Sequence, residues 1–267
     1  MRGSLSAILF CFCCLAGTMH RASAQDMMRY LDLDSPEMTQ AEMTRADVEA
    51  ALAAASKDHP ADLTSRRLSG LDLSGLDLSH AVLRAARLNK TSLAGSRLDG
   101  AILDQAFLLK ADLSHASLKG AHVFAAQMQG AKLDGADLAG ARLVADLSDA
   151  SLKGASLAAA DLGADMKNQS MGLIHAIFRS ANLTGANLAG ANLSHADLEF
   201  AVLKGANLSH ASLEKAALAG ADLSGATLAG ADFAGADLTS AKLIAPVGLD
   251  AARNLDKALN LDRAERR

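Results

Sequence analysis

A leucine returns every fifth residue over most of the chain, and this is its dominant hydrophobic pattern. From Ala181 to Leu243 the units read ANLTG ANLAG ANLSH ADLEF AVLKG ANLSH ASLEK AALAG ADLSG ATLAG ADFAG ADLTS AKL. Alanine opens every unit, and the position two residues later is leucine except for Phe233. A period of five fits neither an α-helix, at about 3.6 residues per turn, nor the alternation of a strand. The chain must turn a corner once per unit, and we predict a coil.

Each unit is too short to bury its own apolar side chain, so neighbouring turns must stack and share one core. The central leucine fills the interior, and the alanine two residues earlier also points inward. The other positions vary among Asp, Asn, Ser, Lys, Thr and Gly, as solvent-facing positions tolerate. This A-(D/N)-L-x-x pattern resembles the pentapeptide-repeat family. The resemblance implies an all-β solenoid: a right-handed quadrilateral parallel β-helix with four pentapeptides per coil.

The repeat domain is predicted to span residues 61–245 as about nine coils. The central residues keep their period from Leu63 to Leu143, and Leu147 then comes one residue early. After Leu162 the register resumes at Leu173. The central residues that are not leucine are Val123, Met128, Phe178 and Phe233.

The segment from Ala164 to Ile174 breaks the period. A continuous register would place Lys167 in the apolar interior, where burial of an unpaired charge is costly. We therefore expect the chain to bulge or loop out here. One interpretation is an absorbed insertion. The other is a recognition loop with Met171 and Ile174 at its tip, because irregular segments on rigid scaffolds often bind partners.

The first 24 residues have the pattern of a secretory signal peptide. Arg2 precedes an apolar stretch from Leu5 to Gly17, and Ala22-Ser23-Ala24 forms an A-x-A cleavage site. We predict cleavage between Ala24 and Gln25 and a periplasmic or secreted location. The alternative is a retained membrane anchor, but the stretch is shorter than the about 20 residues of a spanning helix.

Cleavage changes the composition of the mature chain. It removes all three cysteines, which lie at positions 11, 13 and 14, so neither a disulfide framework nor a thiolate site is expected. It also removes Arg2 and Arg21, which shifts the net charge from −4 to about −6. This mildly acidic balance gives no reason to expect binding of nucleic acid or of an anionic membrane.

The segments on either side of the repeat are predicted to be helical caps. Within residues 25–60, Ser35 and Pro36 form a helix-start signal for one helix that ends before Pro60. Its apolar stripe is Met38, Ala41, Val48, Leu52 and Ala55. This helix either covers the open edge of the first coil or binds a partner. Within residues 246–267, a stripe of Leu249, Ala252, Leu255 and Leu259 predicts a short helix or two helical turns at the other end.

No catalytic, cofactor-binding or metal-ligating residue is predicted. Aspartates such as Asp222 share the position before the central leucine with asparagines such as Asn182, and a catalytic carboxylate would not tolerate that exchange. Histidines recur two residues after central leucines, at predicted corners. His195 and His210 are 15 residues apart, so they occupy different corners and do not stack as a metal pair.

The leading functional hypothesis is an exported, non-enzymatic scaffold or protein-interaction module with an unknown protein partner. Apolar side chains at predicted outward positions are the weak candidates for binding it: Phe107, Leu109, Phe124 and Phe200, with Met171 and Ile174 of the break. We expect no nucleic-acid partner and no stable membrane anchor after cleavage. Homodimerisation through an end of the solenoid is a further option.

Two other function classes fit the sequence less well. The family resemblance implies that a member could mimic B-form DNA and bind type II topoisomerases, protecting them from quinolones. The export signal and the modest charge, with lysines such as Lys204 and Lys215 among the acids, disfavour this. A polysaccharide-acting β-helix enzyme would need carboxylates grouped on long loops, and the insertion after Leu162 is short.

Overall fold

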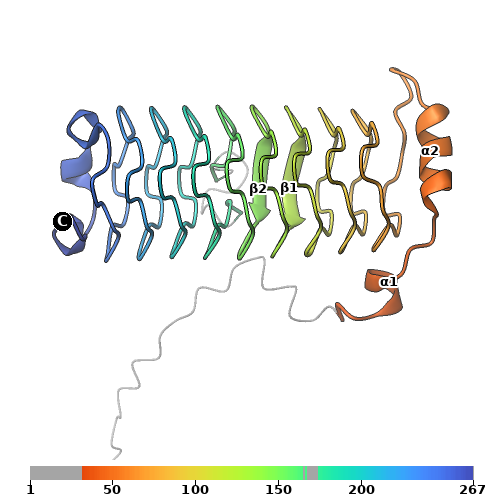
Figure 1. Ribbon diagram of the computed structural model, residues 1–267, viewed down its shortest axis with the longest axis horizontal. Coiled ribbons are helices and arrows are strands. Elements are labelled where there is room, and N and C mark those ends of the chain that lie inside the picture. Colours follow the sequence, from red (N-terminus) through yellow and green to blue (C-terminus); the bar gives the residue numbers. More distant parts are fainter. Residues whose placement is uncertain (1–31, 165, 167–173, 267) are drawn as a thin grey trace, which may run out of the picture.

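The computed structural model describes residues 32–164, 166 and 174–266, which form a rod of stacked four-sided coils (Figure 1). The predicted signal peptide and Met171 lie outside these residues. Four ladders of parallel bridges run along the rod, and each defines one face. Face 1 starts at Asp62, face 2 at Arg67, face 3 at Asp72 and face 4 at Asp77. A face comprises the ladder residue, the buried residue after it, and the two corner residues that follow.

The positions predicted to point inward are buried. Leu188 and Ala186 have no exposed area, and neither do Phe178 and Phe233. One continuous apolar cluster runs from Leu63 to Leu243. Burial of one leucine side chain contributes about 1.5–3 kcal/mol, so the stacked leucines are the main source of stability.

The corners explain why units so often end in glycine. The second corner residue has a positive φ, +66° at Gly190 for example, which glycine adopts without the steric cost of a Cβ atom. The predicted corner histidines take the same conformation, as His195 (φ +63°) and His210 (φ +59°) show. For residues with a Cβ atom this conformation costs about 1–2 kcal/mol.

Two short strands lie where the repeat loses one residue. β1 (His122–Gln127) pairs in parallel with β2 (Arg142–Asp146), and their register shifts between Phe124 and Gln127. β2 turns the corner from face 1 to face 2 with one residue fewer than β1. The early position of Leu147 follows from this shorter corner.

The prediction that Leu173 restarts the repeat is wrong. Asp161 belongs to face 1, and the next ladder residue is Ile177, which pairs with Asp146 on face 2. Phe178 is therefore the buried residue that follows Leu162. Leu173 itself, like Lys167, lies outside the described residues. The Ala164 N–H still donates to the Ser194 carbonyl oxygen at 3.1 Å, and the next described ladder residue is Ile177, at the same corner that is short in β2.

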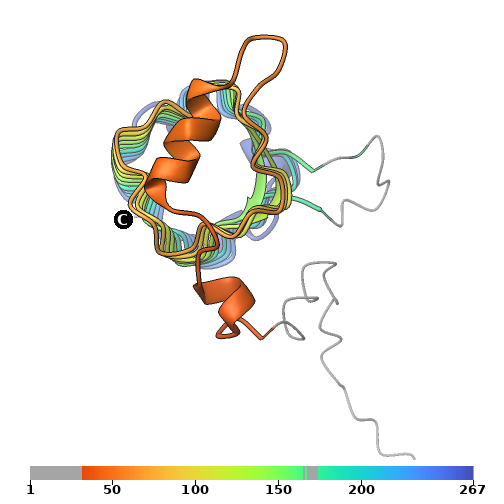
Figure 2. The ribbon, with the colours of Figure 1, turned by 90° about the vertical axis from the view of Figure 1, so that its right-hand side faces the viewer.

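The N-terminal segment forms two helices, and the prediction of one continuous helix is wrong. α1 (Pro36–Thr39) and α2 (Arg45–Ala53) are separated because Thr44 starts a new helix. Its hydroxyl and backbone N–H form a capping box with Asp47. α2 crosses the open end of the first coil (Figure 2). Val48, on the side of α2 that meets the core, is fully buried.

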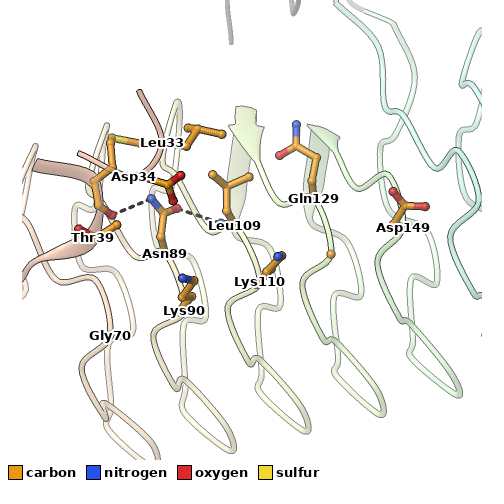
Figure 3. Close-up of a pocket in the computed structure, with 12 residues that line it drawn as sticks. Leu33, Asp34, Thr39, Gly70, Asn89, Lys90, Leu109, Lys110, Gln129 and Asp149 are labelled. Carbon is orange, nitrogen blue, oxygen red and sulfur yellow. Dashed lines mark hydrogen bonds between the residues drawn. The ribbon is translucent and has the colours of Figure 1, made fainter. Parts of the chain in front are cut away.

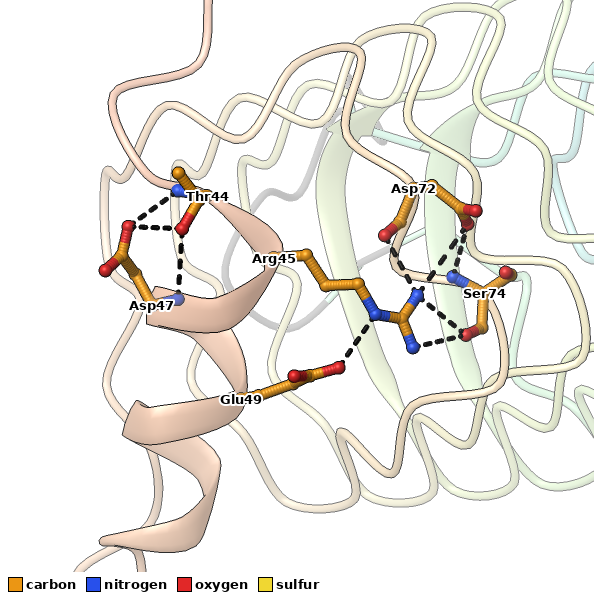
Figure 4. A network of polar contacts seen from close by, with 6 residues as sticks. All are labelled: Thr44, Arg45, Asp47, Glu49, Asp72 and Ser74. Atoms are coloured by element: carbon orange, nitrogen blue, oxygen red, sulfur yellow. Dashed lines mark hydrogen bonds and ion pairs between the residues drawn. The ribbon is translucent and has the colours of Figure 1, made fainter.

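Polar groups of the N-terminal segment also form hydrogen bonds with the backbone groups at the free edge of the first coil. Arg45 Nη1 donates hydrogen bonds to the carbonyl oxygens of Asp72 (3.0 Å) and Ser74 (3.2 Å) (Figure 4). The backbone N–H of Glu42 donates to the carbonyl oxygen of Arg67 at 2.9 Å, and a Glu42 carboxylate oxygen accepts from the Arg67 N–H at 3.2 Å. Among the described residues no coil comes before the first one to bond these groups, so the segment covers an edge that would otherwise pair with other chains.

The C-terminal segment, predicted as a short helix or two helical turns, forms three short 3-10 turns that add a further layer to the rod. Three 3-10 turns follow one another: η2 (Leu249–Ala251), η3 (Leu255–Lys257) and η4 (Leu261–Arg263). They repeat every six residues. The ladder residues between them are Val247, Arg253, Leu259 and Glu265. Leu259, predicted on the stripe of the C-terminal helix, lies instead on the face 2 ladder and is 55% exposed. No helix within the described ranges is long and apolar enough to cross a membrane.

Candidate protein-interaction surface

Two of the five exposed large apolar side chains lie on face 2, and two more lie at its borders. Among the described residues the five are Leu33, Met166, Phe200, Val247 and Leu259. Phe200 and Leu259 belong to face 2, and Leu33 lines a groove against it. Met166 belongs to the segment that joins face 1 to face 2. Val247 lies on face 4. Four of these five side chains thus lie on or beside one wall of the rod.

The residues predicted to bind a partner fall on the same wall or its border. Phe107 is a half-buried ladder residue of face 2, and Leu109 is a corner residue of the same coil. Phe200 is a corner residue of face 2 further along the rod. Ile174 is half-buried and precedes the point where the chain joins face 2. Phe124 lies at the corner between faces 1 and 2.

Phe124 is already engaged within the wall. Its ladder partner is Val144 of β2, and the Arg142 guanidinium lies 5.6 Å from the centre of its ring. This distance is within the range of a cation–π interaction. Phe124 therefore stabilises the irregular corner, and it offers less free surface than sequence reasoning assumed.

Phe200 is the most exposed of the large apolar side chains, at 63%. Its ring lies over Gly220 of the next coil: a Cβ atom at Gly220 would come within 2.6 Å of the ring. Beside it, Arg179 bridges Asp197 (2.6 Å) and Glu199 (3.1 Å). The ring is thus supported from below and flanked by a charged cluster. A rigid, exposed aromatic side chain of this kind is typical of binding hot spots.

A groove of about 460 Å³ separates the segment around α1 from face 2 (Figure 3). The segment is anchored at the Met38 carbonyl oxygen, which accepts hydrogen bonds from Ser69 Oγ (2.9 Å) and Asn89 Nδ2 (3.0 Å). The Asn89 side-chain oxygen accepts the Leu109 N–H at 3.0 Å. Ser69 and Asn89 are both buried. Hydrogen bonds satisfy the buried polar groups of Ser69 and Asn89, and the same bonds hold the segment around α1 at a fixed distance from face 2.

The groove combines an apolar mouth with charged side chains. Leu33 and Leu109 point into it from opposite sides (Figure 3). Lys90 and Lys110 line one side on successive coils, and Asp149 lies at the far end. The lysines and Leu33 were not identified from the sequence. The spacing of the two lysines could have identified them, because residues 20 positions apart occupy the same corner of adjacent coils.

Carboxylates elsewhere on the rod have structural partners. The Asp72 side chain accepts a hydrogen bond from the backbone N–H of Ser74 at 3.0 Å, and Asn182 accepts from Thr184 at 3.1 Å in the same way. Burial and the positive charge of Lys215 lower the pKa of His195. Within the described part of the chain, no three His, Cys, Asp or Glu side chains are grouped so that they could hold a metal ion.

Comparisons with known proteins converge on one family. The family model for pentapeptide repeats matches residues 61–100, 91–123, 181–217 and 206–243. The chain is 34% identical to HetL, a pentapeptide repeat protein involved in heterocyst differentiation regulation from the cyanobacterium Nostoc sp. strain PCC 7120. That match covers 84% of this chain and 95% of HetL, with a TM-score of 0.71.

Other solved structures match less closely. Rfr23, a pentapeptide repeat protein from the cyanobacterium Cyanothece 51142, is 32% identical over 46% of this chain and 60% of its own, with a TM-score of 0.18. QnrB1, a plasmid-mediated fluoroquinolone resistance protein, is 18% identical over 74% of this chain and 77% of its own, with a TM-score of 0.37. No curated protein sequence matches the chain significantly.

Proposed function

The chain belongs to the pentapeptide-repeat family, whose members fold as right-handed quadrilateral β-helices, and on that premise we propose that it is a non-enzymatic scaffold that binds a protein through face 2. The scaffold in this proposal is a rod of about nine coils, closed by α2 at one end and by the C-terminal turns at the other. It is exported after cleavage between Ala24 and Gln25, and it needs no cofactor.

The observation that carries the proposal is the unequal distribution of apolar side chains among the four faces. Solvated walls of a solenoid are expected to be polar, and scattered apolar residues on them are normal. Phe200 and Leu259 on face 2, with Leu33 and Met166 at its borders, are spread along one wall, and this distribution favours a protein interface. Phe200 supplies the rigid aromatic anchor that such interfaces use.

The charges on face 2 support a defined orientation of the partner. Arg87, Lys90 and Lys110 lie on the coils near α2, whereas Asp149 lies further along the rod; Glu199, further still, is paired with Arg179. A partner with the opposite order of charges would be steered into one direction along the wall. HetL is involved in regulation, and a regulatory binding role is consistent with a wall of this kind.

Affinity capture with a matched variant tests the proposal. The chain from Gln25 to Arg267 is immobilised and exposed to the exported and cytoplasmic fractions of the source cells, and the retained proteins are quantified by mass spectrometry. The face 2 variant carries Phe107→Ser, Leu109→Ser and Phe200→Ser. The control carries Val82→Ser and Ile102→Ser on face 1 and Val202→Ser on face 3, which are ladder residues of similar character.

We expect the wild-type chain and the control to retain the same exported protein and the face 2 variant to lose it, with unchanged circular dichroism spectra. Equal retention by all three chains would contradict the assignment of face 2. Retention of a type II topoisomerase from the cytoplasmic fraction would instead support the alternative suggested by the family resemblance.

A further inference from the structure

The groove beside α1 has the dimensions of an extended peptide. Its lining begins at Gly70 in the first coil and reaches Asp149 in the fifth. Adjacent coils are about 4.8 Å apart, so the groove is roughly 19 Å long. An extended chain advances about 3.3 Å per residue, and about six residues would fill this length.

Two ammonium groups in the groove are available to a ligand. Lys90 and Lys110 are exposed corner residues on successive coils, and glycines occupy the same corner on the coils before and after them. Neither lysine makes an ion pair with a residue that the structure describes. Lys119 and Lys204, by contrast, lie 3.1 Å and 3.3 Å from a carboxylate oxygen. The spacing of about 4.8 Å lets both ammonium groups reach one carboxylate.

The Gln129 side chain lies further along the groove. The Gln129 side-chain amide donates to the Gln127 side-chain oxygen (2.9 Å) and to an Asp146 carboxylate oxygen (2.8 Å). These bonds fix the orientation of the amide. Its Oε1 atom is buried and has no hydrogen-bond partner among the described residues. A ligand in the groove does not reach an atom without accessible surface, so Gln129 contributes a fixed polar wall to the groove and no acceptor.

These features occur in a fixed order along the rod. The cations of Lys90 and Lys110 come first, with Leu33 and Leu109 forming the apolar mouth beside them and Asp34 next to Leu33 (Figure 3). The Gln129 side chain follows, and the Asp149 carboxylate lies at the end. From Lys110 to Asp149 is two coils, or roughly 10 Å, which an extended chain covers in about three residues.

We propose that this groove binds an extended segment of the protein partner in which an acidic residue and a neighbouring apolar residue precede a basic residue by about three positions. The acid bridges Lys90 and Lys110, the apolar side chain lies between Leu33 and Leu109, and the base meets Asp149. This inference rests on the proposed function and specifies how the partner is recognised. A small amphiphilic carboxylate is a poorer match, because its alkyl tail would leave Asp149 without a partner of opposite charge.

Selection from a random heptapeptide library displayed on phage tests the inference. The target is the folded chain from Gln25 to Arg267, and the most enriched peptide is synthesised and titrated by fluorescence anisotropy. The charge-neutral variant carries Lys90→Gln and Lys110→Gln. The control carries Lys132→Gln and Lys153→Gln, two exposed lysines on adjacent coils of face 3, so both proteins lose the same charge.

We expect enriched peptides to share the acidic–apolar–basic order. Loss of the two groove lysines should weaken binding by about tenfold or more, since it removes two charge-assisted hydrogen bonds. The face 3 control should bind like the wild type, and Lys90→Glu with Lys110→Glu should select peptides with a base in place of the acid.

Three results would overturn the inference: enrichment without a charge order, equal binding by the groove variant and the control, or saturable binding of dodecanoate through the two lysines without peptide enrichment. If the face 2 variant still loses its partner in the capture experiment, the proposed function survives such a result. If capture is also indifferent to face 2, the proposed function fails as well.

Discussion

At the scale of single residues, aspartate and asparagine alternate before the central leucine because both supply the same oxygen to the same turn. Asp72 accepts the N–H of Ser74, and Asn182 accepts that of Thr184. The exchange of the two residue types predicted that these side chains point outward and do not catalyse. It could not predict the bond to the residue two positions later, because that bond depends on the backbone angles of the corner.

These turns should make the stability of the rod depend on pH. The nearby Ser74, Ser79 and Ser114 hydroxyl groups, followed by the backbone N–H groups of the same serines, lower the pKa values of Asp72, Asp77 and Asp112. Each of these N–H groups donates to the carboxylate at 3.0 Å. A carboxylate with a lowered pKa in the folded state stabilises it above the unfolded pKa of about 3.9. That contribution is lost as the pH falls through the folded values. We therefore expect the urea midpoint to decrease from pH 5 to pH 3.

The matched test replaces Asp72, Asp77 and Asp112 by asparagine, whose side-chain oxygen still accepts the turn N–H but does not titrate. This variant should lose less stability between pH 5 and pH 3 than the wild type. A control with Asp250→Asn, Asp256→Asn and Asp262→Asn changes exposed aspartates that no Ser or Thr follows two residues later. An equal loss in the turn variant and the wild type would show that these bonds do not stabilise the fold.

At the scale of elements, the sequence predicted the walls better than the ends. Each wall residue such as Leu188 is buried by its own stack, so a five-residue period suffices to place it. The ends follow other rules. Thr44 interrupts the predicted helix because a capping box with Asp47 outweighs the apolar stripe through it. The C-terminal leucines were assigned to a helix because their true period of six, from Leu249 to Leu261, lies close to two helical spacings of three.

Disruption of the packing of α2 against the first coil should destabilise the whole rod. Val48→Asp would bury an unpaired carboxylate against the first coil, where Val48 has no exposed area. We expect the melting temperature to fall clearly and soluble aggregates to form, because the uncovered edge can pair with other chains. Differential scanning calorimetry and light scattering measure both effects. Ala46→Asp, an exposed change in the first turn of the same helix, should leave both unchanged. Similar melting of the two variants would mean that α2 is dispensable.

At the scale of the whole molecule, the face on which a residue lies depends on every unit before it. An extra unit centred on Leu173 would rotate everything that follows by one face and place Phe200 on face 3. The structure joins Asp161 to Ile177 without such a unit, and Phe200 falls on face 2 with Phe107 and Leu109. The candidate residues could therefore be identified from the sequence, but their gathering on one wall could not. The register of the repeat across the break is ambiguous in the sequence, and the face of every later residue depends on it.

A change of register between the two halves of face 2 tests whether the partner contacts both of them. Insertion of one unit, Ala-Asn-Leu-Ser-Gly, between Gly190 and Ala191 adds a buried leucine and rotates the following coils by one face. Phe200 would move to face 3, while Phe107 and Leu109 stay in place. Because each repeat contacts only its neighbouring coils, we expect the melting temperature to change little. Capture of the exported partner should be lost.

Insertion of four such units at the same place is the matched control. It returns Phe200 to face 2 but moves it one coil, about 4.8 Å, further along the rod. Since face 2 is continuous again, capture should be partly regained, and the ratio of partner retained by the two variants measures the requirement for a shared wall. Full capture by the single-unit variant would mean that the residues near α1 suffice, and Phe200 would then lie outside the interface.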